Sequence, residues 1–398
     1  MQFLRNQLDK IKHNFEKGGK LEKYYHAYEA FDTFLFAPNT TTLSKGVQVR
    51  DAIDLKRLMM TVIISMVPCL LFGMWNIGHQ HFMAIGQTDA SFGEKFWVGT
   101  VQTVPIIIVS YVVGLGIEFL FSVLRKHPVN EGFLVTGMLI PLVMPPDVPL
   151  WQVALATAFA VVIGKEAFGG TGMNVVNVAL TARAFIYFAY PSNMSGEVWT
   201  YIGEGQKVVA GYSGATPLAV ASEATGSVVS VLNDFGASWF QGIYSLPNLF
   251  MGVMPGSIGE TSTLMCLIGA AILIASGAGS WKIILGVFAG AYGMGLFLNA
   301  VGSSPITQMP AYYHLVIGGL AFGAVFMATD PVTAAHTETG KWYYGFLIGI
   351  FTVLIRAFNP AYPEGIMLAI LLMNVFAPLI DYFVVEANKK RRLKRATV

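Results

Sequence analysis

The most prominent feature of the sequence is a series of long apolar windows that contain no charged side chain. A bilayer core of about 30 Å takes roughly 20 mostly apolar residues in a helix, so these windows predict membrane spans. The longest window, 283–329, accommodates two spans with a turn at 303–305. The pattern predicts an all-α polytopic membrane protein of about ten transmembrane helices, at 58–76, 100–124, 132–146, 148–165, 174–190, 261–278, 281–300, 311–328, 342–357 and 364–385.

Composition supports this interpretation. Only 12% of the 398 residues are charged and 54% are hydrophobic, whereas soluble domains carry roughly 25% charged residues. A net charge of +2 gives no basis for nucleic-acid binding. Cys69 and Cys266 are the only cysteines, which excludes a disulfide scaffold and a four-thiolate cluster within this chain. Redox chemistry would therefore need an organic cofactor.

Basic residues predict the orientation, because cytoplasmic loops carry an excess of Lys and Arg. Ten of the 25 lie in residues 1–57, six lie in 389–395, and five follow the even-numbered spans. Both termini are thus expected in the cytoplasm. The expected organisation is a basic N-terminal segment, a first membrane repeat, a non-cytoplasmic loop, a second membrane repeat and a basic tail, at 1–57, 58–190, 191–260, 261–385 and 386–398.

The two membrane halves show a similar order of features. Pro145-Pro146-Asp147 follows the third span and Asp330-Pro331 follows the eighth. Five spans is an odd number, so a second copy would be inverted relative to the first. Inverted repeats with interrupted helices place polar sites near the midplane of the membrane. The alternative is that two unrelated halves share Pro–Asp turns by chance.

One tetrapeptide in the predicted non-cytoplasmic loop could carry a modification. Ser213-Gly214-Ala215-Thr216 follows a glycine at 211. Glycines let a bulky group approach the backbone, and the Thr216 hydroxyl could accept a phosphoryl ester. On spacing alone, such a segment is more often an ordinary surface loop.

This tetrapeptide resembles the flavinylation motif in which a threonine carries FMN through a phosphoester bond, although position 210, often acidic in such motifs, is alanine here. The chain as a whole resembles the B subunit of the bacterial Na+-translocating NADH:quinone oxidoreductases, and also the related D subunit of Rnf complexes. The basic extension before the first span fits the former better. Further segments that carry the resemblance are KEAFGGTGMN at 165–174, PGSIGE at 255–260, FMATDP at 326–331 and NPAYPEG at 359–365.

The resemblance implies two flavins, a covalent FMN on Thr216 and a non-covalent riboflavin held by Asn174 and Asn177. Carboxamides both donate and accept hydrogen bonds, which suits the alternating edge of a flavin ring. Their spacing of three would place both on one helix face. Alternatively, Asn174 serves as a helix N-cap.

Charged residues within predicted spans are functional candidates, because burying a charge in hydrocarbon costs about 3 kcal/mol. The resemblance places Glu118, Asp330, Asp381 and Glu29 on the sodium pathway. Carboxylate oxygens suit a hard cation such as Na+. The alternative for each carboxylate is an ion pair, for example with Arg183.

Two glycines before Glu118, Gly114 and Gly116, resemble the family region associated with quinone. Small residues in membrane helices also serve close packing. The implied function is that of a bacterial inner-membrane subunit. It would pass electrons from NADH, through partner subunits A, C, D, E and F and the two flavins, to ubiquinone, coupled to Na+ export. A dedicated flavin transferase would install the FMN. The alternatives are an Rnf-type D subunit of a ferredoxin:NAD oxidoreductase and a non-redox small-solute channel.

Overall fold

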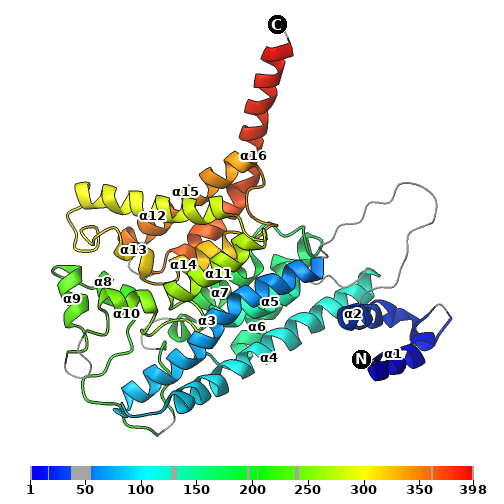
Figure 1. Cartoon of the computed structure of the whole chain (residues 1–398), viewed down its shortest axis with the longest axis horizontal. Coiled ribbons are helices and arrows are strands. Elements are labelled where there is room, and N and C mark those ends of the chain that lie inside the picture. The colour runs from blue at the N-terminus through cyan, green and yellow to red at the C-terminus, as the bar shows by residue number, and fades with distance from the viewer. Residues whose placement is uncertain are drawn as a thin grey trace.

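A computed structural model describes residues 2–16, 18–36, 55–126, 132–194, 198–203, 205–237, 242–359 and 362–396. Within these ranges every regular element is a helix, which confirms the predicted all-α class (Figure 1). Parts of the predicted N-terminal segment, 37–54 among them, lie outside the described residues. The first half contains α1 (Gln2–Phe15), α2 (Tyr25–Leu35), α3 (Leu55–Ala84), α4 (Phe92–Arg125), α5 (Phe133–Leu142), α6 (Leu150–Gly164) and α7 (Val178–Ala189), with short 3-10 turns η1 (Glu22–Tyr24), η2 (Glu166–Phe168) and η3 (Pro191–Asn193).

The second half begins after three short helices, which occupy the predicted non-cytoplasmic loop. These are α8 (Pro217–Ser222), α9 (Val228–Asp234) and α10 (Leu246–Met251). They share an apolar cluster with Met83 at the end of α3 and with Tyr313, and this cluster includes Leu218, Leu232 and Tyr244. The remaining helices are α11 (Thr263–Ala275), α12 (Trp281–Val301), α13 (Tyr313–Val316), α14 (Leu320–Phe322), the π-helical turn η4 (Gly323–Met327), α15 (Glu338–Phe358) and α16 (Ile366–Ala396).

Six of the described helices are long and apolar enough to cross a membrane, so the chain is a multi-pass membrane protein. They correspond to the predicted first, second, fourth, seventh, ninth and tenth spans. The helices α5, α7 and α11 have only 10, 12 and 13 residues, and at 1.5 Å per residue each reaches about 15–20 Å, well short of a bilayer core. The predicted lengths of these three spans were therefore wrong.

The predicted eighth span is interrupted between α13 and α14, where Gly318 adopts a positive φ of 69°. Two charged side chains, the buried Arg356 and the partly buried Glu364, satisfy backbone groups at this break. The Arg356 guanidinium donates to the carbonyls of His314 (2.7 Å) and Ile317 (2.9 Å). The Glu364 carboxylate accepts from the Gly319 N–H at 3.0 Å. A cation at a helix C-terminus and an anion at an N-terminus both match the helix dipole.

Glycines allow the closest helix packing in the molecule, between α12 and α15, which run side by side (Figure 1). Each helix carries a Gly-x-x-x-Gly pattern, with Gly286 and Gly290 on one and Gly345 and Gly349 on the other. A Cβ at Gly290 would collide with the backbone of α15 at Phe346. Small residues at this spacing let membrane helices approach closely.

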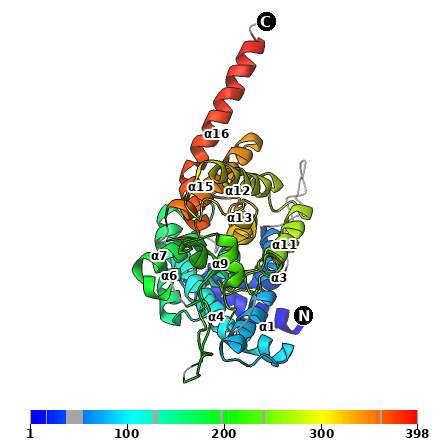
Figure 2. The same ribbon diagram turned by 90° about the vertical axis from the view of Figure 1, so that its left-hand side faces the viewer.

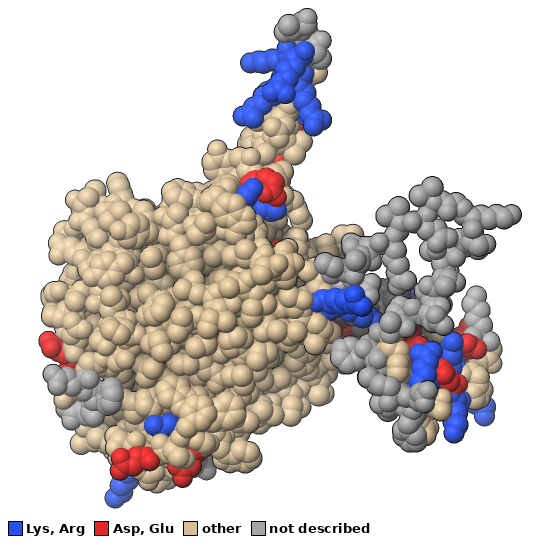
Figure 3. Space-filling model, viewed as in Figure 1, with Lys and Arg blue, Asp and Glu red and all other residues tan. Residues whose placement is uncertain are grey.

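Charged side chains gather at the ends of the molecule. In the view of Figure 3, Lys and Arg cluster on the N-terminal helices and on the projecting end of α16, while the broad face of the body is almost free of charge. Figure 2 shows α16 projecting from the body in a second view. An uncharged belt of this kind is what lipid contact requires.

Candidate functional site

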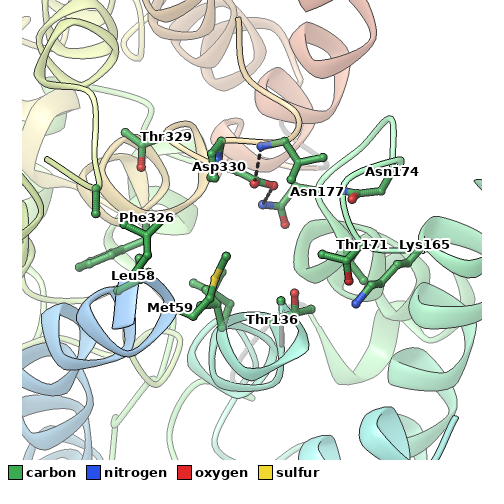
Figure 4. A pocket seen from close by; sticks show the side chains of 18 of the residues that line it. Leu58, Met59, Thr136, Lys165, Thr171, Asn174, Asn177, Phe326, Thr329 and Asp330 are labelled. Carbon is green, nitrogen blue, oxygen red and sulfur yellow. Dashed lines mark hydrogen bonds between the residues drawn. The ribbon is translucent and has the colours of Figure 1, made fainter. Parts of the chain in front are cut away.

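Two cavities contain four of the residues that the sequence singled out, Asn174, Asn177, Asp330 and Thr216. The first, here called the asparagine cavity, is lined by Asn174, Asn177 and Asp330 together with Thr171 and Lys165 (Figure 4). It lies where α3 and α5 meet the breaks before α7 and after η4. Short helices that end inside the protein leave unpaired backbone groups, so polar side chains are expected at such a place.

The sequence predicted correctly that the two asparagines are close, but for the wrong reason. The helix α7 begins at Val178, and its N-cap is Asn177, whose side chain accepts from the Leu180 N–H at 3.1 Å. Asn174 therefore lies in the turn before the helix, where its amide donates to the Val176 carbonyl at 3.1 Å. They do not share a helix face, and Asn174 is not the cap. Both still line one cavity.

The polar groups of this cavity suit a flavin edge, although its volume is small. Asn174 and Asn177 supply amides, and the buried Thr171 hydroxyl has no hydrogen-bond partner. The remaining lining is largely apolar, with Leu58, Phe326 and others. The volume of about 90 Å³ is that of about three waters in the liquid, so the lining residues would have to move apart to admit a ring of isoalloxazine size. The polar side chains of the asparagine cavity therefore fit riboflavin, but the cavity would have to widen locally to hold it.

Asp330 lies at the wall of the asparagine cavity, and several hydrogen-bond donors contact its carboxylate. Its carboxylate accepts from the Val332 N–H and the Thr333 hydroxyl, both at 3.1 Å, and from the Asn177 amide at 3.4 Å. A third cavity of about 390 Å³, lined by His336, Glu338 and others, shares Ala278, Thr329 and Pro331 with the asparagine cavity. The two spaces are therefore neighbours.

Glu118 is held in an ion pair with Lys165, and both side chains are only 4% exposed. The pairing that the sequence left open for Glu118 is thus present, with a lysine as partner. The same lysine lines the asparagine cavity and lies 5.8 Å from the centroid of the Phe133 ring. Sequence reasoning missed Lys165 as a site residue, although its place inside the KEAFGG segment between two apolar runs was the available signal.

Asp381 and Glu29 lie apart from the asparagine cavity. The Asp381 carboxylate accepts from the N–H groups of His336 (2.7 Å) and Thr337 (2.9 Å), just before α15. Through His336 it touches the wall of the neighbouring third cavity. Glu29 belongs to α2 and pairs with His26 at 3.5 Å. The structure therefore does not bring the four predicted sodium residues together.

The two glycines predicted near quinone differ in their surroundings. A Cβ at Gly114 would run into the Phe133 ring, which packs directly on this part of α4. A Cβ at Gly116 would meet nothing within 4 Å. Gly114 therefore serves close packing, whereas Gly116 faces open space.

The second cavity, here called the threonine cavity, contains Thr216 and has a volume of about 610 Å³. That size is within the range of small-molecule sites. Four aromatic side chains line it, from Tyr187, Trp199, Phe235 and Tyr362. A wide space with aromatic walls and a half-buried threonine fits a flavin attached to that threonine.

The tetrapeptide is fixed in place at this cavity. Thr216 precedes α8, and its hydroxyl accepts from the Ala219 N–H at 3.3 Å. The Tyr244 hydroxyl donates to the Ala215 carbonyl. Burial raises the pKa of Tyr244 well above its ordinary value, so the hydroxyl keeps the proton that this bond needs.

One buried ion pair adjoins the threonine cavity. Arg183, from α7, lines it and pairs at 2.5 Å with Glu260, which precedes α11. The sequence suggested Arg183 as a partner for one of the sodium-pathway carboxylates, and that pairing was wrong. Glu260 belongs to the PGSIGE segment. That motif marked Glu260 as a residue of interest but did not indicate that it pairs with Arg183.

Comparison with known proteins adds the following. Residues 42–390 match the model of the NQR2, RnfD, RnfE family. The chain is 49% identical to the B subunit of the Na(+)-translocating NADH-quinone reductase of Ectopseudomonas mendocina, over 98% of this chain and 99% of the relative. The proteins of the same name from Stutzerimonas stutzeri and Chromohalobacter salexigens are also 49% identical, over 98% of this chain and 99% and 96% of their own lengths.

Proposed function

The chain belongs to the NQR2, RnfD, RnfE family, and from this we propose that it is the B-type membrane subunit of a sodium-pumping NADH:quinone oxidoreductase of the bacterial inner membrane. The observation that carries the proposal is the position of Thr216. The threonine of the flavinylation-like motif lies on the wall of a cavity large enough for a small molecule and lined by four aromatic residues. A loop with no such role would not need that cavity.

FMN esterified to Thr216 would supply one- and two-electron chemistry outside the cytoplasm. The chain's contribution is to hold and shield it. Trp199 and Phe235 offer flat apolar faces, and the hydrogen bond from Tyr244 to Ala215 fixes the backbone next to the attachment point. A flavin transferase would use the half-buried hydroxyl before the cavity is filled.

Riboflavin is proposed for the asparagine cavity. Asn174, Asn177 and the unpartnered Thr171 hydroxyl would supply donors and acceptors to its edge. Because the cavity is small, the lining around Leu58 and Phe326 would move apart on binding. The two flavins and ubiquinone, with Gly116 at an open stretch of α4, would form the electron path through this subunit.

Sodium is proposed to enter through the third cavity, which borders both the asparagine cavity and the Asp381 region. Asp330 lies at the junction, and Glu118 would take part when Na+ competes with the Lys165 ammonium for its carboxylate. Glu29 would act on the cytoplasmic approach. We also propose that α3 to α7 and α11 to α16 are inverted five-segment repeats, because the third segment is short in the first half and broken in the second, and a turn with Pro and Asp follows it in both.

The test is covalent flavin on the chain. The protein is expressed with its flavin transferase and partner subunits, separated on a denaturing gel and examined for flavin fluorescence. Thr216→Ala should abolish the fluorescent band. Thr225→Ala is the matched control, because Thr225 lines the same cavity outside the motif, and it should keep the band.

A fluorescent Thr216→Ala chain would refute the assignment, and mass spectrometry of the intact chain would locate the adduct. A colourless wild-type chain would favour the non-redox channel. Na+-stimulated NADH:quinone reduction by the assembled complex separates the proposed enzyme from an Rnf-type complex, which would use ferredoxin and NAD instead.

A further inference from the structure

Arg183 is the only Lys or Arg among the described residues that line the threonine cavity. Arg183 is 2% exposed, and its Nη1 lies 2.5 Å from a carboxylate oxygen of Glu260. Its Nε has no hydrogen-bond partner. A buried donor without a partner costs about 1–3 kcal/mol, so the guanidinium lacks one hydrogen-bond acceptor.

The surroundings of Arg183 are charge-balanced. The buried Glu260 and Arg356 and the partly buried Glu364 complete a set of two cations and two carboxylates beside the break between α13 and α14. Glu364 and the exposed Glu223 also line the threonine cavity. Of the two members of the Arg183–Glu260 pair, only the arginine lines the cavity. A group in the cavity therefore lies nearer to the positive end of this pair than to the negative end.

We propose that Arg183 sets the reduction potential of the flavin on Thr216 by holding a positive charge near its ring. This inference rests on the proposed function. Two electrons and one proton delivered to an isoalloxazine ring make its charge more negative by one. Here the electrons come from NADH through partner subunits and the proton comes from solvent. A cation that is itself buried, as Arg183 is, stabilises that added charge, because the low dielectric around it weakens screening.

The geometry predicts opposite effects for two changes. Glu260→Gln removes the more distant negative charge and leaves the arginine in place, so the flavin becomes easier to reduce. Arg183→Gln combined with Glu260→Gln replaces the ion pair with a neutral amide pair, without stranding either charge. This double variant removes the nearer positive charge, so the flavin becomes harder to reduce. A general loosening of the site would move both variants in the same direction.

The experiment is a redox titration of the assembled complex followed by flavin absorbance. The component present in the wild type and missing in Thr216→Ala defines the Thr216 flavin. At a fixed ambient potential, the ratio of reduced to oxidised flavin should rise about tenfold in Glu260→Gln, which is about 30 mV for a two-electron couple. In the double variant it should fall by about threefold to tenfold, because the two Coulomb terms partly cancel.

Opposite shifts of this component support the proposal. An unmoved midpoint in both variants, or shifts of the same sign, would overturn it while leaving the covalent flavin at Thr216 in place. If Thr216→Ala removes no flavin component at all, the proposed function fails and this inference fails with it. In-gel fluorescence of each variant confirms that the chain has folded well enough to be modified. If the double variant fails to fold, Glu260→Gln alone still tests whether the midpoint potential of the flavin rises.

Discussion

Replacing Glu118 by Gln removes one half of the buried ion pair with Lys165, and the structure sets the size of the effect. Both side chains are 4% exposed, so the remaining charge cannot reach bulk water. Removing one partner of such a pair costs about 3–5 kcal/mol. The Phe133 ring near the Lys165 ammonium offsets about 1 kcal/mol of this for Glu118→Gln. Lys165→Met should therefore be the more damaging single change.

The assay is thermal unfolding of the purified complex in lipid nanodiscs at one fixed heating rate. Each single variant should lower the apparent melting temperature by about 5 °C. The double variant Glu118→Gln with Lys165→Met removes both charges and should recover most of that loss, because no charge then has to be desolvated. Additive losses in the double variant would refute the pairing argument.

The same variants separate stability from sodium handling. If Na+ competes with Lys165 for Glu118, the double variant should be stable and yet need about tenfold more Na+ for half-maximal quinone reduction, equivalent to about 1.4 kcal/mol of lost cation binding. An unchanged Na+ dependence in a stable double variant would remove Glu118 from the proposed route.

Three further changes have expected outcomes. Asp381→Asn should cost about 2 kcal/mol, because the carboxylate accepts from N–H groups at the start of α15; an unchanged melting temperature would contradict this. Gly114→Ala should destabilise by about 1–3 kcal/mol through collision with Phe133, whereas Gly116→Ala, in open space, should be neutral or stabilising by up to about 1 kcal/mol; equal thermal shifts would refute the distinction. Asn177→Ala should lose about 1 kcal/mol of helix capping together with the acid-extractable riboflavin, measured by chromatography, and full retention of that flavin would remove Asn177 from its proposed site.

Hydropathy predicted which segments enter the membrane but not where the backbone breaks within it. The six long spans were found because a charge-free run of sufficient length is rare outside membranes. The short helix α7 was extended too far back because the window without charged residues runs through 167–182, while the capping role of Asn177 is a local hydrogen bond. The early start of α4 at Phe92 was missed, since the capping box of Ser91 and Glu94 lies outside the apolar window.

Individual candidate residues could be picked out from the sequence, but the ion pairs that they form could not. The motif singled out Thr216 as a candidate, and the segment 165–177 singled out Asn174 and Asn177, because both are local patterns. Which carboxylate meets which cation depends on contacts across the fold, as between Arg183 and Glu260, 77 positions apart. No periodicity in the sequence encodes such a distance.

The break between α13 and α14 has a consequence for synthesis of the chain. Residues 313–327 leave the ribosome before Arg356 and Glu364, which satisfy the backbone at that break. Unsatisfied carbonyl and amide groups in hydrocarbon cost several kcal/mol each. This segment therefore cannot settle in lipid alone and must wait at the insertion machinery for the following helical hairpin, so that the three enter the bilayer together.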